Sequence, residues 1–464
     1  MVHIFQFKAD TLAYDTESQA LLELDQLAAA CLKAFIDEGG KRPTEETVEA
    51  IGAACDVSIA EANRCLDDIE TLKSEGVLFA SDIDVSLEQL YPDQPVIKSM
   101  CLHICHDCNL RCRYCFAGTG DFGTGDRSLL DVETGRRAID FLIAASGNRI
   151  HLDVDFFGGE PLLNWPVVTE LVDYCEKEGP KHGKELRLTI TTNGVLLDED
   201  KTEYINQHFK NVVLSLDGRP EVQNQMRPNA GNRGSYDVVM PHIKSFVERR
   251  GDKEHYVRGT FTRLFPDFSK DVIHMADLGM RQLSMEPVVA PPGSGYEIRE
   301  EDLPEIMLEY ERLAEDLLSK EGTQNAYNFF HFNIDLTGGP CLYKRLKGCG
   351  VGTEYCAVTP AGDIYPCHQF VGEKEFIMGN VHEVDLNDVY GSLTMPHAEA
   401  FAQLILPDKP DCQECWAKYY CSGGCAANAW HATGDLNGVY EIGCQLTRKR
   451  LECALWLEAK RLSE

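Results

Sequence analysis

Segments with the pattern of buried strands alternate with helical segments between residues 96 and 289 of the chain. Residues 151–156 show the strand pattern most clearly, because polar and apolar side chains alternate there. Strands joined by helices pair in parallel through right-handed crossovers, so the sequence predicts an α/β fold with either a doubly wound sheet or a partial (β/α)6 barrel. In both folds, ligands bind at the carboxyl ends of the strands. The predicted strands cover residues 97–104, 150–157, 186–192, 211–216, 256–262 and 282–289, and the predicted helices cover residues 131–146, 166–178, 199–209, 235–250 and 268–279.

A separate domain is predicted before this alternation, over residues 1–90. Its order is three short strand patterns before residue 25 and then three helical patterns, as in a small winged-helix-like module. Thr44 and Ser58 precede the second and third helical patterns and are the expected N-caps. A short acidic linker at residues 81–93 is expected to end the domain.

The partial barrel is assigned to residues 95–300, and two further segments follow it. Residues 301–338 form a bridging segment whose helix is predicted at residues 303–320. Residues 339–464 are rich in Cys and Gly, and little regular structure is expected there before a last helix at about 446–462. Bound metal is therefore expected to stabilise this last domain.

Cysteine usage points to metal or redox chemistry. The chain of 464 residues has 19 cysteines, no secretory signal at its start and no apolar run as long as the ~20 residues of a membrane span. We therefore expect a cytoplasmic protein without a membrane partner, and in that reducing compartment thiols bind metal more often than they form disulfides. The net charge of −31 argues against nucleic acid as a partner.

The sharpest motif is Cys108-Asn-Leu-Arg-Cys112-Arg-Tyr-Cys115, which lies in the long loop after the first strand of the predicted barrel. Three thiolates at this spacing can bind three irons of a [4Fe–4S] cluster and leave the fourth iron open to a substrate. A zinc site is the alternative, although zinc favours four ligands and a wider separation of its CxxC pairs. Cys101 and Cys105 repeat the spacing with Cys108, but they fall on the strand and are expected to be buried strand residues.

With this motif the sequence resembles the radical S-adenosylmethionine (SAM) enzymes. The resemblance implies that SAM binds the open iron and is cleaved to a 5′-deoxyadenosyl radical, which abstracts a hydrogen atom from the substrate. Other SAM contacts are expected at the strand ends, in Gly-Gly-Glu-Pro, Thr-Thr-Asn-Gly, Ser-Leu-Asp-Gly and Glu-Pro. By resemblance, the residues that bind SAM are Tyr114, Gly158, Gly159, Glu160, Thr192, Asn193, Ser215, Asp217, Arg227 and Glu286.

The C-terminal cysteines resemble the SPASM extension of radical SAM enzymes, which holds two auxiliary clusters. The resemblance implies three [4Fe–4S] clusters in all. The expected ligands of auxiliary cluster I are Cys349, Cys367 and Cys425. Cys356 is the nearest candidate for a fourth ligand and Cys341 the next, and the alternative is an open iron that a substrate thiolate occupies. The expected ligands of auxiliary cluster II are Cys412, Cys415, Cys421 and Cys444.

The whole chain resembles the peptide maturases that form thioether crosslinks in six-cysteine ribosomal peptides. Residues 1–90 then resemble a RiPP recognition element, which binds the leader of a precursor peptide by adding it as a strand to an exposed sheet edge. Flavodoxin or ferredoxin is the expected electron donor. No residue of the sequence identifies a general base.

Three other functions stay open from the sequence alone. An anaerobic sulfatase-type maturase, which oxidises Cys or Ser to formylglycine, and a maturase that forms carbon–carbon crosslinks share the core and SPASM motifs. A non-catalytic, zinc-stabilised peptide-binding protein belongs to a different class. Iron content separates it from the enzymes, since three [4Fe–4S] clusters contain about twelve irons.

Overall fold

The computed structural model describes residues 1–82, 96–337, 341–394 and 397–463, and most of the predicted linker lies outside these ranges. Its largest element is a ten-stranded sheet in the order β10-β9-β8-β7-β6-β5-β4-β11-β12-β13. The strands from β4 to β9 pair in parallel with their neighbours, as the alternation predicted. They are β4 (Ser99–Cys105), β5 (His151–Gly158), β6 (Glu185–Thr192), β7 (Asn211–Ser215), β8 (Tyr256–Phe261) and β9 (Gln282–Pro287).

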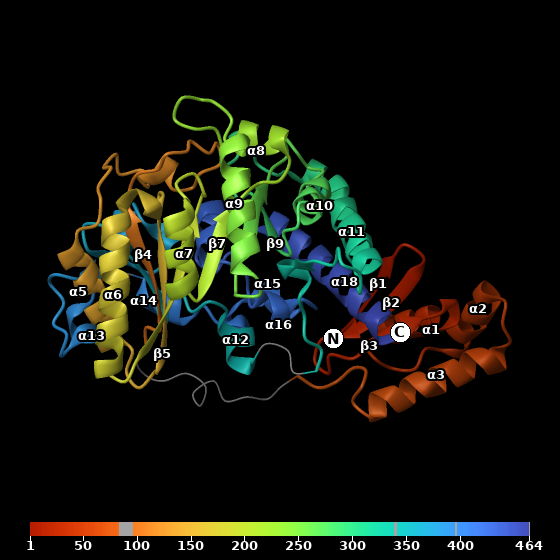
Figure 1. Cartoon of the computed structure of the whole chain (residues 1–464). Helices are drawn as coiled ribbons and strands as arrows, with labels where there is room; N and C mark the ends of the chain where they lie inside the picture. Colours follow the sequence, from red (N-terminus) through yellow and green to blue (C-terminus); the bar gives the residue numbers. More distant parts are fainter. Residues whose placement is uncertain (83–95, 338–340, 395–396, 464) are drawn as a thin grey trace.

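Five of the connecting helices agree with the prediction and cover one face of this sheet (Figure 1). They bury the apolar residues of each strand, such as Leu152, Val154 and Phe156 of β5, which belong to the main hydrophobic core. The alternating residues of the strands face the other way. The sequence did not predict the short helix α8 (Pro220–Met226). The predicted helices are α5 (Val132–Ala145), α6 (Trp165–Lys181), α7 (Glu199–His208), α9 (Tyr236–Arg250) and α10 (Ser269–Asp277).

The N-terminal segment has the predicted three strands and three helices. An antiparallel sheet of β1 (Val2–Phe7), β2 (Asp10–Asp15) and β3 (Leu21–Leu24) packs on α1 (Gln26–Asp37), α2 (Glu45–Cys55) and α3 (Ile59–Ser74). Both predicted caps are confirmed. Thr44 accepts a hydrogen bond from the amide of Thr47, and Ser58 forms a capping box with Glu61.

The other face of this small sheet packs against the C-terminal helix α18 (Glu441–Ser463), as Figure 1 shows. The ring of Phe7 stacks on Trp456 at 4.0 Å, and His3 stacks on Trp416 at 4.0 Å. Asp10 accepts a hydrogen bond from Trp456 Nε1 at 2.8 Å. The N-terminal segment is therefore attached to the cysteine-rich end of the chain.

The expectation of little regular structure after residue 339 was only partly right. Here β11 (Tyr355–Val358) adds to β4 in parallel and continues the sheet through β12 (Asp363–Tyr365) and β13 (Gly379–Asn380). These strands have two to four residues, which is too short for hydrophobic periodicity to reveal. The remaining helices here are short: α12 (Leu342–Lys347), α13 (Val389–Ser392), α14 (Ala398–Ala402), α15 (Pro410–Gln413), α16 (Lys418–Cys421) and α17 (Ala426–Thr433).

The predicted bridging helix is α11 (Leu303–Lys320), which packs along α18. After it, β10 (Asn328–Phe329) pairs with the edge of β9. Over the described ranges, no helix has both the length and the apolar character that a membrane crossing requires.

Candidate active site in the loop after β4

The loop that follows β4 holds Cys108, Cys112 and Cys115 close together, and each thiol is partly covered. Burial raises the pKa of Cys108 to about 12, and the nearby thiols of Cys112 and Cys115 contribute to this rise. Burial also raises the pKa of Cys112 to about 11, against the opposing effect of the Arg227 charge. The structure therefore places the three thiols of the motif in one partly enclosed site, where bound cations would favour their thiolate forms.

The competing cysteines lie on the strand, as predicted. Cys101 and Cys105 are buried in β4, where their side chains are almost inaccessible to solvent. The Cys105 thiol donates to the carbonyl oxygens of Glu160 at 2.9 Å and Asp107 at 3.2 Å. It therefore serves to connect the start of the cysteine loop to the end of β5.

Gly158 and Gly159 let the end of β5 approach the cysteine loop closely. A Cβ at Gly159 would lie 2.0 Å from the carbonyl oxygen of Asp107, and one at Gly158 would lie 2.3 Å from that of Cys105. Gly158 also has a φ of +118°, which residues with side chains rarely adopt. Any side chain at these two positions would displace the loop that holds the thiols.

Glu160 lies directly after these glycines and is completely buried. Its carboxylate accepts hydrogen bonds from Thr192 Oγ1 at 2.7 Å and from the amides of Asn193 at 2.8 Å and Leu162 at 3.1 Å. Burial raises its pKa to about 6, and these donors oppose the rise. Glu160 thus joins the ends of β5 and β6, while Asn193 Nδ2 points to Cys108 Sγ at 3.6 Å.

Tyr114, Asp217 and Arg227 form a buried cluster beside the cysteines. The Tyr114 hydroxyl donates to Asp217 Oδ2 at 2.5 Å and accepts from Arg227 Nη1 at 3.0 Å. Arg227 Nη1 also lies 3.4 Å from Asp217 Oδ1. Burial raises the pKa of Asp217, and the charge of Arg227 opposes this.

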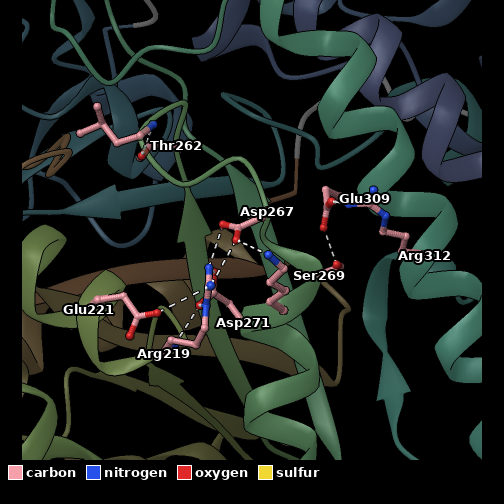
Figure 2. Close-up of polar contacts among 10 residues, drawn as sticks. Arg219, Glu221, Thr262, Asp267, Ser269, Asp271, Glu309 and Arg312 are labelled. Atoms are coloured by element: carbon pink, nitrogen blue, oxygen red, sulfur yellow. Dashed lines mark hydrogen bonds and ion pairs between the residues drawn. The ribbon is translucent and has the colours of Figure 1, made fainter.

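Arg219 anchors the loop after β7, which carries Asp217 of this cluster. Figure 2 shows the Arg219 side chain between two carboxylates that follow β8, with Nε 2.8 Å from Asp271 and Nη2 2.8 Å from Asp267. A Cβ at Gly218 would lie 2.3 Å from Asp271 Cβ, so this glycine permits the contact. In the same view the Ser269 hydroxyl donates a hydrogen bond to the buried Glu309 of α11, which also accepts one from Arg312.

The last two predicted SAM-binding residues lie further around the sheet. Ser215 ends β7 and is partly buried. Glu286 of β9 lies 3.3 Å from Arg450, 3.4 Å from His331 and 3.5 Å from Arg258. No sequence pattern links Glu286 to these three basic residues, because they come from β8, the segment after β10, and α18.

The C-terminal cysteines gather in the two predicted groups. The pKa of Cys367 is raised by burial and by the thiols of Cys425 and Cys349, which shows that these three lie close together. In the second group, burial and the nearby thiols of Cys421 and Cys412 raise the pKa of Cys444 to about 12. Burial likewise raises the pKa of Cys412, and the nearby thiols of Cys421 and Cys415 contribute to this rise.

Cys356 and Cys341 lie apart from the first of these groups. Cys356 is completely buried in β11, within the main hydrophobic core, and burial alone raises its pKa to about 12. Cys341 is exposed and precedes α12, a helix that packs against α16 of the second group. The structure therefore brings three cysteines, not four, to the first group.

The residues present fit a cluster and SAM. Within the described ranges, no three His, Cys, Asp or Glu side chains converge as closely as the ligands of one metal ion. Two buried nitrogens near Cys108 and Cys112, Arg227 Nε and Asn109 Nδ2, have no hydrogen-bond partner among the described residues. Both are donors, and donors suit the carboxylate and other acceptors of a SAM molecule.

Comparisons with known proteins agree with this geometry. Residues 102–278 match the radical SAM superfamily, and residues 349–416 match the SPASM iron–sulfur cluster-binding domain. The mycofactocin maturase MftC of Mycolicibacterium smegmatis is 26% identical over 338 residues, which cover 71% of this chain and 78% of MftC.

Two solved structures share the fold. The structure of anSMEcpe with bound AdoMet matches 78% of this chain and 100% of its own, with a TM-score of 0.64 and 20% identity. Streptococcus suis SuiB, bound to its precursor peptide SuiA, matches 96% of this chain and 98% of its own, with a TM-score of 0.54 and 17% identity. The second match extends over almost the entire chain.

The partial barrel, the thiol loop at its first strand and the two C-terminal cysteine groups thus have one common explanation. The chain is a radical SAM enzyme with a SPASM domain, and its cofactors are SAM and three [4Fe–4S] clusters.

Proposed function

We propose that this enzyme oxidises a ribosomally made precursor peptide and forms a thioether crosslink from one of its cysteines. The observation that carries the proposal is the combination of a three-thiol site beside buried SAM-type donors with a strand-edge groove in the N-terminal segment. The maturase name of MftC and the peptide-bound SuiB structure support a peptide substrate. Oxidation to formylglycine and carbon–carbon crosslinking remain the competing reactions.

The proposed cofactor site uses the thiols of Cys108, Cys112 and Cys115 and the donors around them. When bound there, the cluster and SAM supply a 5′-deoxyadenosyl radical, which abstracts a hydrogen atom from the peptide. Gly158 and Gly159 let the β5 backbone line the site, and Arg227 offers its free Nε to the SAM carboxylate. The remaining proposed contacts are Tyr114, Glu160, Thr192, Asn193, Ser215, Asp217 and Glu286.

The two C-terminal groups are the proposed auxiliary sites. Cys412, Cys415, Cys421 and Cys444 provide a full set of four thiolates for auxiliary cluster II. Cys349, Cys367 and Cys425 provide three for auxiliary cluster I, because Cys356 lies in the core of the sheet. The fourth iron of that cluster would then be open to the sulfur of the peptide cysteine. Flavodoxin or ferredoxin remains the proposed donor of the electron that starts the reaction.

The proposed leader site is the β1 groove, which lies between residues 2–6 of β1 and the helix α1. The groove has a volume of about 590 Å³ and is lined on the helix side by Ala30, Lys33 and Ile36, among others. In the described sheet β1 pairs with β2 alone, so its outer backbone edge is available for an added strand. An extended leader can hydrogen-bond to this edge while its side chains enter the groove.

The decisive experiment combines SAM cleavage with the fate of the peptide. Anaerobically reconstituted protein is given SAM, dithionite and synthetic peptides from the short reading frames that flank the gene. We expect formation of 5′-deoxyadenosine and a peptide that has lost two hydrogens and one free thiol. A peptide that gains an aldehyde, with loss of sulfur from Cys or without it from Ser, would indicate formylglycine. A peptide that loses two hydrogens, keeps its thiols and has no aldehyde would indicate a carbon–carbon crosslink. The absence of any modified peptide would contradict the maturase proposal.

Filling the β1 groove is expected to weaken peptide binding without affecting SAM. Ala30→Arg places a long charged side chain in the groove, and we expect the affinity for the peptide that the enzyme oxidises to fall at least about tenfold, which corresponds to roughly 1.4 kcal/mol. Fluorescence anisotropy with the labelled peptide measures this. Ala53→Arg on the exposed side of α2 is the matched control and should bind normally. Equal affinity of the two variants would show that the leader binds elsewhere.

A further inference from the structure

The inner face of the sheet, which faces away from helices α5–α10, is unusually polar along its central strands. On β5 it carries Asp153 and Asp155, and on β6 it carries Thr189 and Thr191. Arg258 of β8 and Glu286 of β9 continue the face on the far side of β7. Charged and hydroxyl groups on the inside of a barrel are costly unless they are paired or serve a ligand.

Most carboxylates near the site are committed to structural partners. Glu160 accepts hydrogen bonds from the donors of β6 and its own loop. Glu286 is surrounded by Arg258, His331 and Arg450, and the charges of the two arginines help to hold its pKa below the ordinary value despite burial. Asp153 pairs with Arg187 at 2.9 Å. Each of these three carboxylates therefore already has close hydrogen-bond or ion-pair partners of its own.

Asp155 differs from them because its carboxylate is held weakly. Its hydrogen bond from Thr191 Oγ1 is long, at 3.4 Å. Asp155 lies opposite Cys101 of the neighbouring strand β4, and its side chain is partly accessible on the inner face. Burial raises its pKa to about 7, and Thr191 and the charge of Arg258 oppose the rise. The titratable and charged groups that face it are Cys101 of β4, Arg258 of β8 and Tyr355 of β11.

These neighbours connect Asp155 with the first C-terminal cysteine group. The Tyr355 hydroxyl lies 2.8 Å from His368 Nδ1, and burial together with the nearby Cys101, Cys367 and Asp155 holds its pKa well above the ordinary value. Burial raises the pKa of Cys101, and the nearby Asp155 and Cys367 contribute to this rise. Along β5, Asp155 lies three residues before Gly158, or about 10 Å at the usual rise of a strand. Asp155 therefore lies on the inner face beside Cys101 and Tyr355, which neighbour Cys367, and on the strand whose end lines the three-thiol site.

We propose that Asp155 is the general base that accepts the proton released when the peptide radical is oxidised. This inference rests on the proposed function. After the hydrogen atom has left the peptide carbon, that carbon bonds to the cysteine sulfur while the S–H bond breaks. One proton and one electron must then leave. The Asp155 carboxylate takes the proton, and an oxidised iron–sulfur cluster takes the electron.

The test separates hydrogen abstraction from product formation. Asp155→Asn keeps the shape of the side chain but cannot accept a proton. With the peptide that the wild-type enzyme oxidises, deuterated at the crosslinked carbon, we expect unchanged deuterium transfer into 5′-deoxyadenosine. Crosslinked peptide should decrease by about 10²- to 10⁴-fold, the usual contribution of a general base. Asp155→Glu should recover part of the product, and Asp153→Asn is the matched control.

A second readout does not depend on turnover. Infrared difference spectra of the wild-type holoenzyme should show a protonated carboxyl band that disappears as the pH rises through about 7, and Asp155→Asn should lack it. Product formation by the wild type should increase over the same range, because only the ionised carboxylate accepts a proton. Full product from Asp155→Asn, or a band that survives in it, would overturn the assignment of Asp155 alone. Failure of the wild type to modify any peptide would overturn the proposed function and this inference with it.

Discussion

Replacing Cys108, Cys112 and Cys115 together by Ala is expected to abolish SAM cleavage and to remove one cluster from the protein. These thiols are the only cysteines that the described structure brings to the loop beside Arg227 and Asn193. Without them no iron is held where SAM can bind it. Iron should fall from about twelve to about eight per chain, and 5′-deoxyadenosine should fall to the level found without protein. Iron analysis and chromatography of the reaction products measure the two effects.

The matched control is the double variant Cys101→Ala and Cys105→Ala. It tests the alternative in which Cys101, Cys105 and Cys108, which have the same spacing, bind the cluster. Both side chains are buried on β4, and Cys105 bonds two backbone carbonyls, so their loss should cost some stability but no iron. About twelve irons and normal SAM cleavage are expected. If the control loses a cluster while the triple variant keeps its 5′-deoxyadenosine, the motif has been assigned in the wrong register.

A third variant distinguishes the core site from the auxiliary sites. Removing Cys412, Cys415 and Cys421 should also release about four irons, yet the loop after β4 stays intact. We therefore expect this variant to cleave SAM without forming modified peptide. The pair of triple variants thus separates loss of the radical from loss of the later oxidation.

Local patterns were sufficient to predict the central strands and the cysteine groups. The strands from β4 to β9 are each buried on one side by helices, so hydrophobic alternation and length identify them within a few residues. The caps at Thr44 and Ser58 depend on neighbours three residues away, which the sequence also displays. The cysteine groups were found because their short spacings and the order of the surrounding elements agree.

What the sequence could not supply depends on contacts between distant segments. The pairing of β11 with β4 joins residues about 250 positions apart, and nothing local in Tyr355–Val358 specifies it. The same pairing brings Tyr355 next to Cys101 and Asp155. Asp155 therefore looked like an ordinary polar residue of a half-buried strand. Cys356 was assigned by spacing to auxiliary cluster I, whereas its place in β11 directs its thiol into the hydrophobic core.

The buried cluster of Tyr114, Asp217 and Arg227 leads to the prediction with the largest expected effect on stability. Arg227→Met removes the cation that balances the completely buried Asp217, and the methionine fills most of the same space. Breaking a buried ion pair on one side costs about 3–5 kcal/mol, because the remaining charge has lost its compensation. The free energy of unfolding in urea should fall by about that amount at pH 8. SAM should also no longer raise the melting temperature, because the Nε donor is absent.

The loss in Arg227→Met should depend on pH with a definite sign. Burial already raises the pKa of Asp217 in the folded protein, and removing the opposing charge of Arg227 raises it further. A carboxyl with a raised pKa in the folded state favours folding when it is protonated. The loss of unfolding free energy relative to the wild type should therefore shrink as the pH falls from 8 to 6.

Adding Asp217→Asn should restore part of the stability, since no buried charge is then left alone. Arg249→Met, which breaks only a surface pair with Glu199, should change stability by less than about 1 kcal/mol. A deficit that is the same at both pH values, and that Asp217→Asn does not relieve, would show that Arg227 contributes packing rather than charge.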